Sequence, residues 1–166
     1  EIEDLKPKYG EGLFLALEQN GIIWLATDGE WTHTVYKNRK FYFARINKDD
    51  IMEVAKEPFC YAFAVSQVEH SKSSTLPEID FIIFDEFIPM NARAYIDPEK
   101  EPQLFRHLLS TIVRQRDSIT ILMLANTIDV HSIYFQDMGL KNVKSMKSGQ
   151  IDVYTYPDGV TLPVSI

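Results

Sequence analysis

Two adjacent carboxylates, Asp85 and Glu86, directly follow an apolar run at residues 81–84. An uninterrupted apolar run is typical of a buried parallel strand, and open α/β sheets bind ligands at the carboxyl ends of such strands. At that position one carboxylate can help to hold Mg²⁺ while the other takes a proton from an attacking water. The pair therefore predicts a hydrolytic site, and the alternative is a strand that simply ends in two surface acids.

A second polar side chain, Asn126, follows the next apolar run at residues 119–124. In P-loop nucleotide hydrolases an acid pair at a strand end is the Walker B site, and in the additional-strand class the next strand carries a polar sensor at its tip. Two neighbouring strands would thus deliver polar groups to one edge of a sheet. We interpret Asn126 as a sensor of the γ-phosphate or of the attacking water; the alternative is a cap for the following helix.

The usual partner of a Walker B site does not occur among the 166 residues. There is no G-x-x-x-x-G-K-[ST] phosphate loop, and none of the seven glycines is followed by Lys. That loop supplies the backbone amides and the lysine that cradle the β- and γ-phosphates. We therefore expect the chain to lack the first part of its domain and to bind ATP weakly or not at all.

The elements that position these residues can be predicted in two groups. Upstream, a helix within residues 10–20 precedes a meander of strands at 22–27, 31–36 and 41–46, and residues 49–56 form a short helix or turn. Downstream, strands at 59–65, 81–87 and 119–124 alternate with helices at 97–116 and 131–138, and a late strand covers 151–156. We expect Glu99 and Glu101 in the first turn of the 97–116 helix to complement its dipole.

The fold class predicted from this order is α/β. The alternation of continuous apolar strands with helices indicates a mainly parallel sheet of the P-loop NTPase (ASCE) type, flanked by helices, with an N-terminal antiparallel β meander. We expect one partial ATPase domain over residues 1–166, in which 1–58 form the helix and meander and 59–166 form the Walker B and sensor core.

Composition limits the partners of the chain. It has 166 residues, 45% of them hydrophobic, which suits a single globular domain, and no segment resembles a membrane span. The net charge of −7 counts against an autonomous nucleic-acid binder, because phosphate neutralisation supplies most of such affinity. A local basic loop, or a ring of subunits, could still contact DNA.

Several short motifs resemble, in their order and spacing, those of the DNA-packaging (encapsidation) ATPases of small tailed phages, which are relatives of the large terminase subunits. They lie within residues 39–158 and comprise Phe84-Asp85-Glu86-Phe87-Ile88, Val113-Arg114-Gln115-Arg116, Leu124-Ala125-Asn126 and Tyr134-Phe135. The resemblance implies an ATP-driven motor that assembles as a homo-oligomeric ring at the capsid portal. Such a motor pumps double-stranded DNA into the procapsid in the host cytoplasm, with no membrane involved.

The resemblance also implies roles for individual residues. Asp85 would hold Mg²⁺, largely through water, Glu86 would be the catalytic base, and Asn126 would couple the nucleotide state to movement. Arg114 would act in trans on the ATP of a neighbouring subunit, with Arg116 as the second choice. Lys72 would lie near the nucleotide. The other interpretations are that arginines at a helix C-terminus complement its dipole and that the lysine is simply solvated.

Two further functions compete with the motor ATPase. One is a non-catalytic P-loop-like module that keeps the sheet for assembly and has lost the phosphate loop. The other is a metal-dependent nuclease built on Asp80, Asp85 and Glu86. The nuclease is less favoured, because residues five apart on a strand face opposite sides of the sheet.

Overall fold

The computed structural model describes residues 12–65, 79–88, 100–113, 119–126, 131–157 and 161–165. The chain divides into two compact units, unit 1 (Glu1–Phe63) and unit 2 (Ala64–Ile166). The boundary predicted from the sequence falls earlier, between residues 58 and 59.

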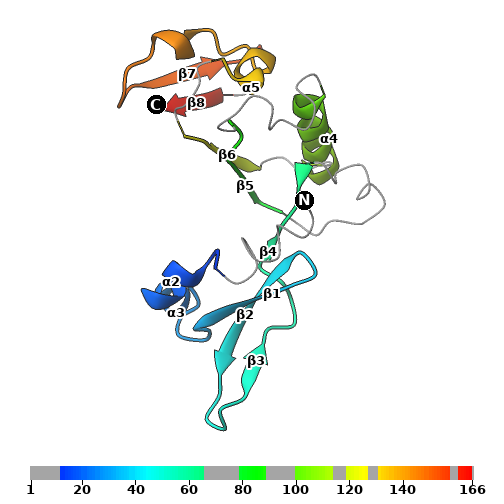
Figure 1. The fold of residues 1–166 in the computed structure, drawn as a ribbon, viewed down its shortest axis with the longest axis vertical. Helices are drawn as coiled ribbons and strands as arrows, with labels where there is room; N and C mark the ends of the chain where they lie inside the picture. Colours follow the sequence, from blue (N-terminus) through cyan, green and yellow to red (C-terminus); the bar gives the residue numbers. More distant parts are fainter. Residues whose placement is uncertain are drawn as a thin grey trace. The chain divides into compact units, whose positions relative to one another are not determined.

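The described part of unit 1 contains two short helices and a small antiparallel sheet (Figure 1). Helices α2 (Leu15–Gln19) and α3 (Ile22–Ala26) precede the hairpin of β1 (His33–Lys37) and β2 (Lys40–Ile46). Strands β3 (Met52–Val54) and β4 (Cys60–Tyr61) pair antiparallel with different halves of β2. The hairpin turn has positive φ at Asn38 (53°) and Arg39 (61°), as a two-residue type I′ turn requires. The predicted strands at 31–36 and 41–46 are thus confirmed within about one or two residues.

An aromatic core and one carboxylate hold unit 1 together. The Phe41 ring is almost wholly buried and its centroid lies 4.9 Å from that of Phe14, which comes just before α2. Glu18 of α2 accepts two hydrogen bonds at Oε1 from Thr34 of β1, one from the backbone N–H (2.8 Å) and one from the hydroxyl (2.6 Å). These contacts fasten α2 to the sheet.

The prediction of a strand at residues 22–27 is wrong, because this segment forms α3. The apolar run is short, and periodicity alone does not separate a buried strand from a helix of that length. Gly21 takes a left-handed φ of 70° at the start of the helix, and the Thr27 hydroxyl donates to the Ile23 carbonyl (2.8 Å) at its end. Local hydrogen bonding therefore decides in favour of a helix.

The prediction of a helix or turn at residues 49–56 is also wrong in its second half, which forms β3. Asn47 Oδ1 accepts from the backbone N–H groups of Asp49 (2.9 Å) and Ile51 (3.0 Å), so a tight turn leads back toward β2. Met52 then pairs with Ile46 in an antiparallel register. This strand exists because of a non-local partner that local propensity does not reveal. The predicted strand at 59–65 is reduced to the two residues of β4, which join the sheet of unit 1.

Unit 2 is built around a strand–helix–strand arrangement. Strand β5 (Phe81–Asp85), helix α4 (Glu101–Val113) and strand β6 (Thr120–Leu124) follow one another, and the two strands pair in parallel. Among the residues of this unit that the structure describes, helix α5 (Ile133–Asp137), the 3₁₀ helix η3 (Asn142–Ser145) and the antiparallel hairpin of β7 (Ile151–Thr155) and β8 (Thr161–Ser165) follow β6. The predicted order of these elements is confirmed, except that η3 and β8 were not predicted. Within the described residues β5–β6 is the one parallel pair, and the P-loop-type sheet stays a prediction.

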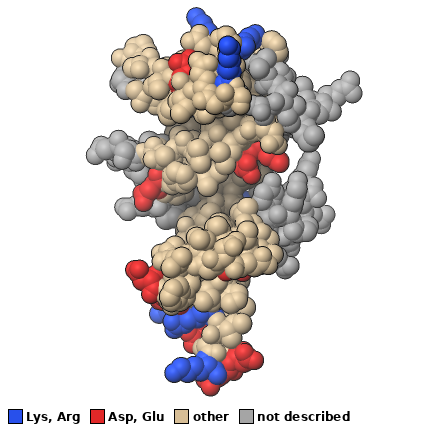
Figure 2. Space-filling model, turned by 90° about the vertical axis from the view of Figure 1, so that its left-hand side faces the viewer, with Lys and Arg blue, Asp and Glu red and all other residues tan. Residues whose placement is uncertain are grey.

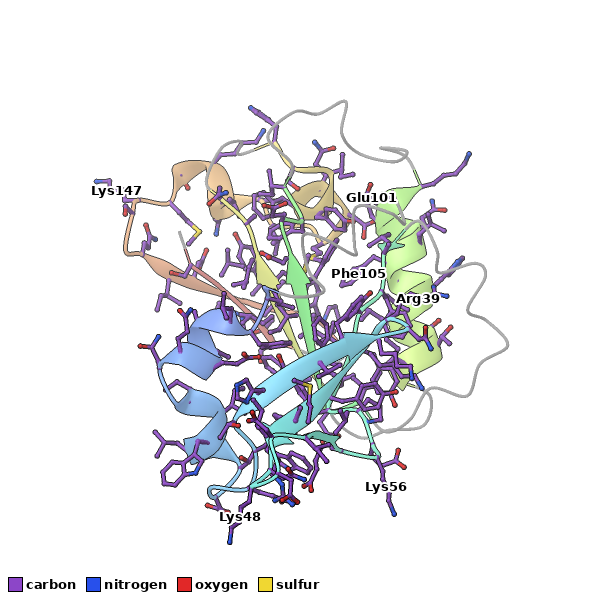
Figure 3. The ribbon with its side chains drawn as sticks, turned by 60° about the horizontal axis from the view of Figure 1, so that its bottom comes forward. Arg39, Lys48, Lys56, Glu101, Phe105 and Lys147 are labelled. Carbon is purple, nitrogen blue, oxygen red and sulfur yellow. The ribbon has the colours of Figure 1, made fainter. Side chains whose placement is uncertain are left out.

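Helix α4 covers one face of this parallel pair. Its residues Phe105, Leu108 and Ile112 are buried, at the helical spacing expected of its apolar face. Figure 3 shows Glu101 and Phe105 on the side of α4 that faces the sheet.

No helix in the described part of the chain is long and apolar enough to cross a bilayer. The longest described helix, α4, has 13 residues, whereas a membrane span needs about 20.

The two faces of the β5–β6 pair differ sharply. One face packs against α4 and α5 through Ile82, Phe84, Ile121 and Met123. The opposite face is exposed, with accessible fractions of 42–58% for Phe81, Ile83, Leu122 and Leu124. The expected burial of both faces is therefore wrong for this chain. Burial alternates from residue to residue along any strand that has helices on one side only, and the apolar sequence does not reveal which faces of the sheet are covered.

Candidate functional site at the carboxyl end of the parallel strands

The parallel register brings three of the predicted site residues to one edge. Asp85 is the last residue of β5 and pairs with Leu124, the last residue of β6. Glu86 follows directly, the Phe87 backbone N–H donates to the Leu124 carbonyl (3.3 Å), and Asn126 lies two residues beyond the end of β6. The prediction that Asp85, Glu86 and Asn126 lie at the same strand ends is confirmed, while their chemical roles stay predictions.

Glu86 has an unusual backbone for its residue type. Its φ is 54°, in the left-handed region, and its N–H donates to Asp85 Oδ1 (3.0 Å). A residue with a Cβ pays about 1–2 kcal/mol for this conformation, whereas glycine adopts it freely. Backbone strain of this kind concentrates at functional sites, where the surrounding structure enforces it.

The donor set suits a magnesium ion that is shared with a substrate. Asp85, Glu86 and Asn126 are all exposed, and they offer carboxylate and amide oxygens. Among the described residues there is no group of three or more His, Cys, Asp or Glu side chains that could hold a metal by themselves. Mg²⁺ is usually bound by one or two carboxylates, substrate phosphates and several waters, so a single strand-end acid pair fits that ion better than a protein-only cage.

Aromatic rings lock the residues on both sides of the acid pair. Phe84 lies 4.5 Å from Phe105 of α4 and 5.4 Å from Tyr134 of α5, measured between ring centroids. Phe87 lies 5.7 Å from Tyr134 and 5.8 Å from Phe135. The Phe84–Phe105 rings are tilted and the other three pairs are edge-to-face, and contacts at these distances add to the burial of the rings, so the turn at Asp85 and Glu86 is held from both ends.

A buried hydrogen bond supports this aromatic cluster. The Tyr134 hydroxyl donates to Glu101 Oε1 (2.9 Å), and both side chains are buried, Tyr134 completely. The prediction that Glu101 lies in the first turn of this helix is confirmed, whereas its burial and its hydrogen bond to Tyr134 were not predicted. The sequence did contain a signal for this aromatic cluster. Phe84 and Phe87 stand on either side of Asp85-Glu86, and both rings need packing partners on the helices that follow.

The remaining predicted residues do not join this edge or cannot be placed at it. Lys72, Arg114 and Arg116 lie outside the described residues. Asp80 precedes β5, at the opposite end of a five-residue strand from Asp85, which separates the two by about 16 Å. The three acids of the nuclease hypothesis therefore do not form one metal site.

Comparison with known proteins gives one match. The family model of the Podovirus DNA encapsidation protein (Gp16) matches residues 29–155, which include β1 through β7 and all three strand-end residues. The chain therefore belongs to this family and is a phage DNA-packaging protein. Searches among curated proteins and among solved structures returned no match.

Proposed function

We propose that this chain is the ATP-hydrolysing part of a motor that moves double-stranded DNA into a phage procapsid. The observation that carries the proposal is the parallel register of β5 and β6, which puts Asp85, Glu86 and Asn126 at one edge. Membership of a DNA encapsidation family supplies the biological task. Hydrolysis of ATP is the step that would drive it.

The proposed division of labour follows from the position of each group. Asp85 would hold Mg²⁺, largely through water, and the ion would supply neutralisation of the charge on the nucleotide phosphates. Glu86 orients the attacking water and accepts its proton. Asn126 contacts the γ-phosphate or that water and so registers which nucleotide is bound. The left-handed backbone of Glu86 supports this role, because it turns the residue out of the strand at the point where the chain leaves β5.

Two further parts of the site would come from outside the described residues. Arg114 is proposed to stabilise the transferred phosphoryl group of the neighbouring subunit, with Arg116 as the second choice, and Lys72 to lie near the nucleotide. A residue that acts in trans requires a ring, which we place at the capsid portal in the host cytoplasm.

The phosphate cradle is the missing component. Because no phosphate loop occurs among the 166 residues, we propose that the isolated chain binds Mg²⁺-ATP weakly. Isothermal titration of the 166-residue chain with Mg²⁺-ATP tests this directly, and micromolar affinity would contradict it.

The catalytic assignment is tested by Glu86→Gln in the full-length packaging protein that contains this sequence. Loss of a general base lowers the rate by about 10²–10⁴-fold, so ATP hydrolysis and DNA packaging should both fall to near background. Glu57→Gln is the matched control, because Glu57 is an exposed glutamate of unit 1, and it should leave hydrolysis unchanged. Wild-type hydrolysis by Glu86→Gln would sink the Walker B assignment.

A non-catalytic assembly module is the second candidate, and the lack of a phosphate loop in this sequence favours it. A full-length protein that packages DNA with a different ATPase, and whose own Glu86→Gln form is fully active in packaging, would establish that alternative.

A further inference from the structure

Residues 140–148 repeat a three-residue pattern that the proposed hydrolytic site does not use. The pattern is an apolar residue, then a lysine, then a small polar residue, and it occurs three times in succession: Leu140-Lys141-Asn142, Val143-Lys144-Ser145 and Met146-Lys147-Ser148. A period of three matches the 3₁₀ helix, in which side chains at i and i+3 are eclipsed.

The structure gives the apolar residues and the lysines of this repeat different environments. Leu140 and Val143 are buried and Met146 is half-buried, whereas all three lysines are exposed. Lys141 and Lys144 are one turn of η3 apart, and Lys147 follows just beyond its end. One 3₁₀ turn rises by about 6 Å, which is close to the roughly 6.8 Å of helix axis covered by two phosphate-to-phosphate steps along one DNA strand.

The segment is fastened to the rest of unit 2. The Leu140 backbone N–H donates to the Phe135 carbonyl (2.8 Å), and the Asn142 backbone N–H donates to the Tyr154 hydroxyl (3.0 Å). The Ser145 hydroxyl donates to the Asn142 carbonyl (2.8 Å). The lysine backbones are therefore held in place before any ligand arrives, which lowers the entropic cost of binding.

The local charge of this segment opposes that of the whole chain. Residues 138–151 contain the three lysines and no acid, within a chain of net charge −7. The flanking acids are already engaged, because Asp137 accepts from Arg106 Nη1 (2.6 Å) and Asp152 Oδ2 accepts from the Asn142 side-chain amide (3.2 Å). Within the described part of the chain, none of the three lysines takes part in an ion pair.

The figures agree with this placement. Figure 2 shows Lys and Arg side chains close together over the segment between α5 and β7, and Figure 3 shows Lys147 pointing away from the ribbon. These ammonium groups can reach a large ligand without a change of the fold.

We propose that the lysine row, Lys141, Lys144 and Lys147, binds the phosphate backbone of double-stranded DNA. Lysine contacts to phosphates position a protein on the duplex without reading its sequence, as a translocating motor requires. Double-stranded DNA is the occupant because the chain belongs to a DNA encapsidation family. This contact is separate from hydrolysis and does not depend on the roles of Asp85 and Glu86.

The test is the salt dependence of duplex binding by the 166-residue chain. A fluorescein-labelled DNA duplex is titrated at a series of KCl concentrations, and affinity is read from fluorescence anisotropy. Each phosphate contact contributes a slope of about −0.9 to log K against log[salt], so replacing all three lysines of the row by Gln should reduce the slope by about 2 to 3. The matched control replaces Lys37, Lys48 and Lys56, three exposed lysines of unit 1, by Gln. Both triple variants change the net charge of −7 equally.

The expected results are loss of slope in the lysine-row variant, the wild-type slope in the control, and the wild-type slope again when the three lysines are replaced by Arg. Equal losses in the two Gln variants would mean that binding follows net charge, which overturns the proposal. Absence of duplex binding by the wild-type chain at low salt, or tighter binding of single-stranded RNA than of the duplex, also overturns it. The outcome is independent of the Glu86→Gln hydrolysis test, so either proposal can fail alone.

Discussion

Replacement of Glu86 by Gly should separate the stability of unit 2 from its activity. The residue has a φ of 54°, a conformation that glycine adopts without strain. Its carboxylate is exposed, so removal of the side chain costs little packing. Glu86→Gly should therefore make the fold more stable while it removes the proposed catalytic base.

The expected size of this gain follows from two opposing terms. Relief of the left-handed strain contributes about 1–2 kcal/mol, and the added freedom of glycine in the unfolded chain costs about 0.5–1 kcal/mol. The net gain is then about 0–1.5 kcal/mol. Asp80→Gly is the matched control, because Asp80 is also an exposed acid next to β5 but has no positive φ. Only the unfavourable term applies there, and the two variants should differ by about 1–2 kcal/mol.

The assay is native-state hydrogen exchange of the β6 amides. Both tryptophans, Trp24 and Trp31, lie in unit 1, so tryptophan fluorescence does not follow the unfolding of unit 2. A stabilisation of about 1 kcal/mol slows exchange through global opening by about fivefold. The full-length Glu86→Gly protein should meanwhile lose ATP hydrolysis. If Glu86→Gly destabilised unit 2 as much as Asp80→Gly does, the strain argument would be refuted.

Three further predictions concern individual contacts. Tyr134→Phe removes the hydroxyl that donates to Glu101 (2.9 Å) and should lower the free energy of unfolding of unit 2 by about 0.5–1.5 kcal/mol. The same variant of the full-length protein should have a lower kcat for ATP hydrolysis with little change in KM. Tyr156→Phe, which removes a hydroxyl bonded to the Met138 carbonyl (2.7 Å), is the control and should leave kcat unchanged. Glu18→Ala should destabilise unit 1 by about 1.5–3 kcal/mol in urea unfolding followed by tryptophan fluorescence, because a carboxylate that accepts two hydrogen bonds is lost; a change near zero would contradict this. Burial raises the pKa of the Cys60 thiol above its ordinary value of 9.0. The protonated thiol therefore contributes fully to the stability of unit 1 below pH 9.0, and this contribution is lost as the pH rises through the folded-state pKa. Cys60→Ala should accordingly lose less stability at alkaline pH than the wild type in the same unfolding assay.

The candidate site could be predicted from the sequence as far as its strand ends. Two apolar runs separated by a helix indicated a parallel pair, and a parallel pair places Asp85, Glu86 and Asn126 at one edge whatever the details of packing. The left-handed backbone of Glu86 was not predictable, since glutamate rarely adopts a positive φ and no residue-type signal marks it. The burial of Glu101 also depends on a partner 33 residues away, at Tyr134, and first-turn statistics carry no information about it.

The fold was predictable where local and non-local signals agree. The hairpin of β1 and β2 has alternating residues and an Asn in its turn, so sequence and structure coincide. Strand β8 was missed because it contains Pro163, and proline argues against a strand. The proline is tolerated here, opposite Val153, because in a two-stranded hairpin each strand has an outer edge at which no backbone N–H has to donate to a neighbouring strand. Helix α3 and strand β3 were missed because short apolar segments take the structure that their neighbours allow.

The one-sided packing of the β5–β6 pair has a consequence for handling the chain in solution. Four large apolar side chains on this face, Phe81, Ile83, Leu122 and Leu124, remain accessible to water. Sulfate and phosphate salts strengthen the burial of such surfaces, whereas low concentrations of urea weaken it. Solubility of the isolated 166-residue chain should accordingly fall with added sulfate, and self-association should increase with protein concentration, even though the net charge of −7 favours dispersion. Purification and crystallisation conditions for this chain are thus set by an apolar surface more than by its charge.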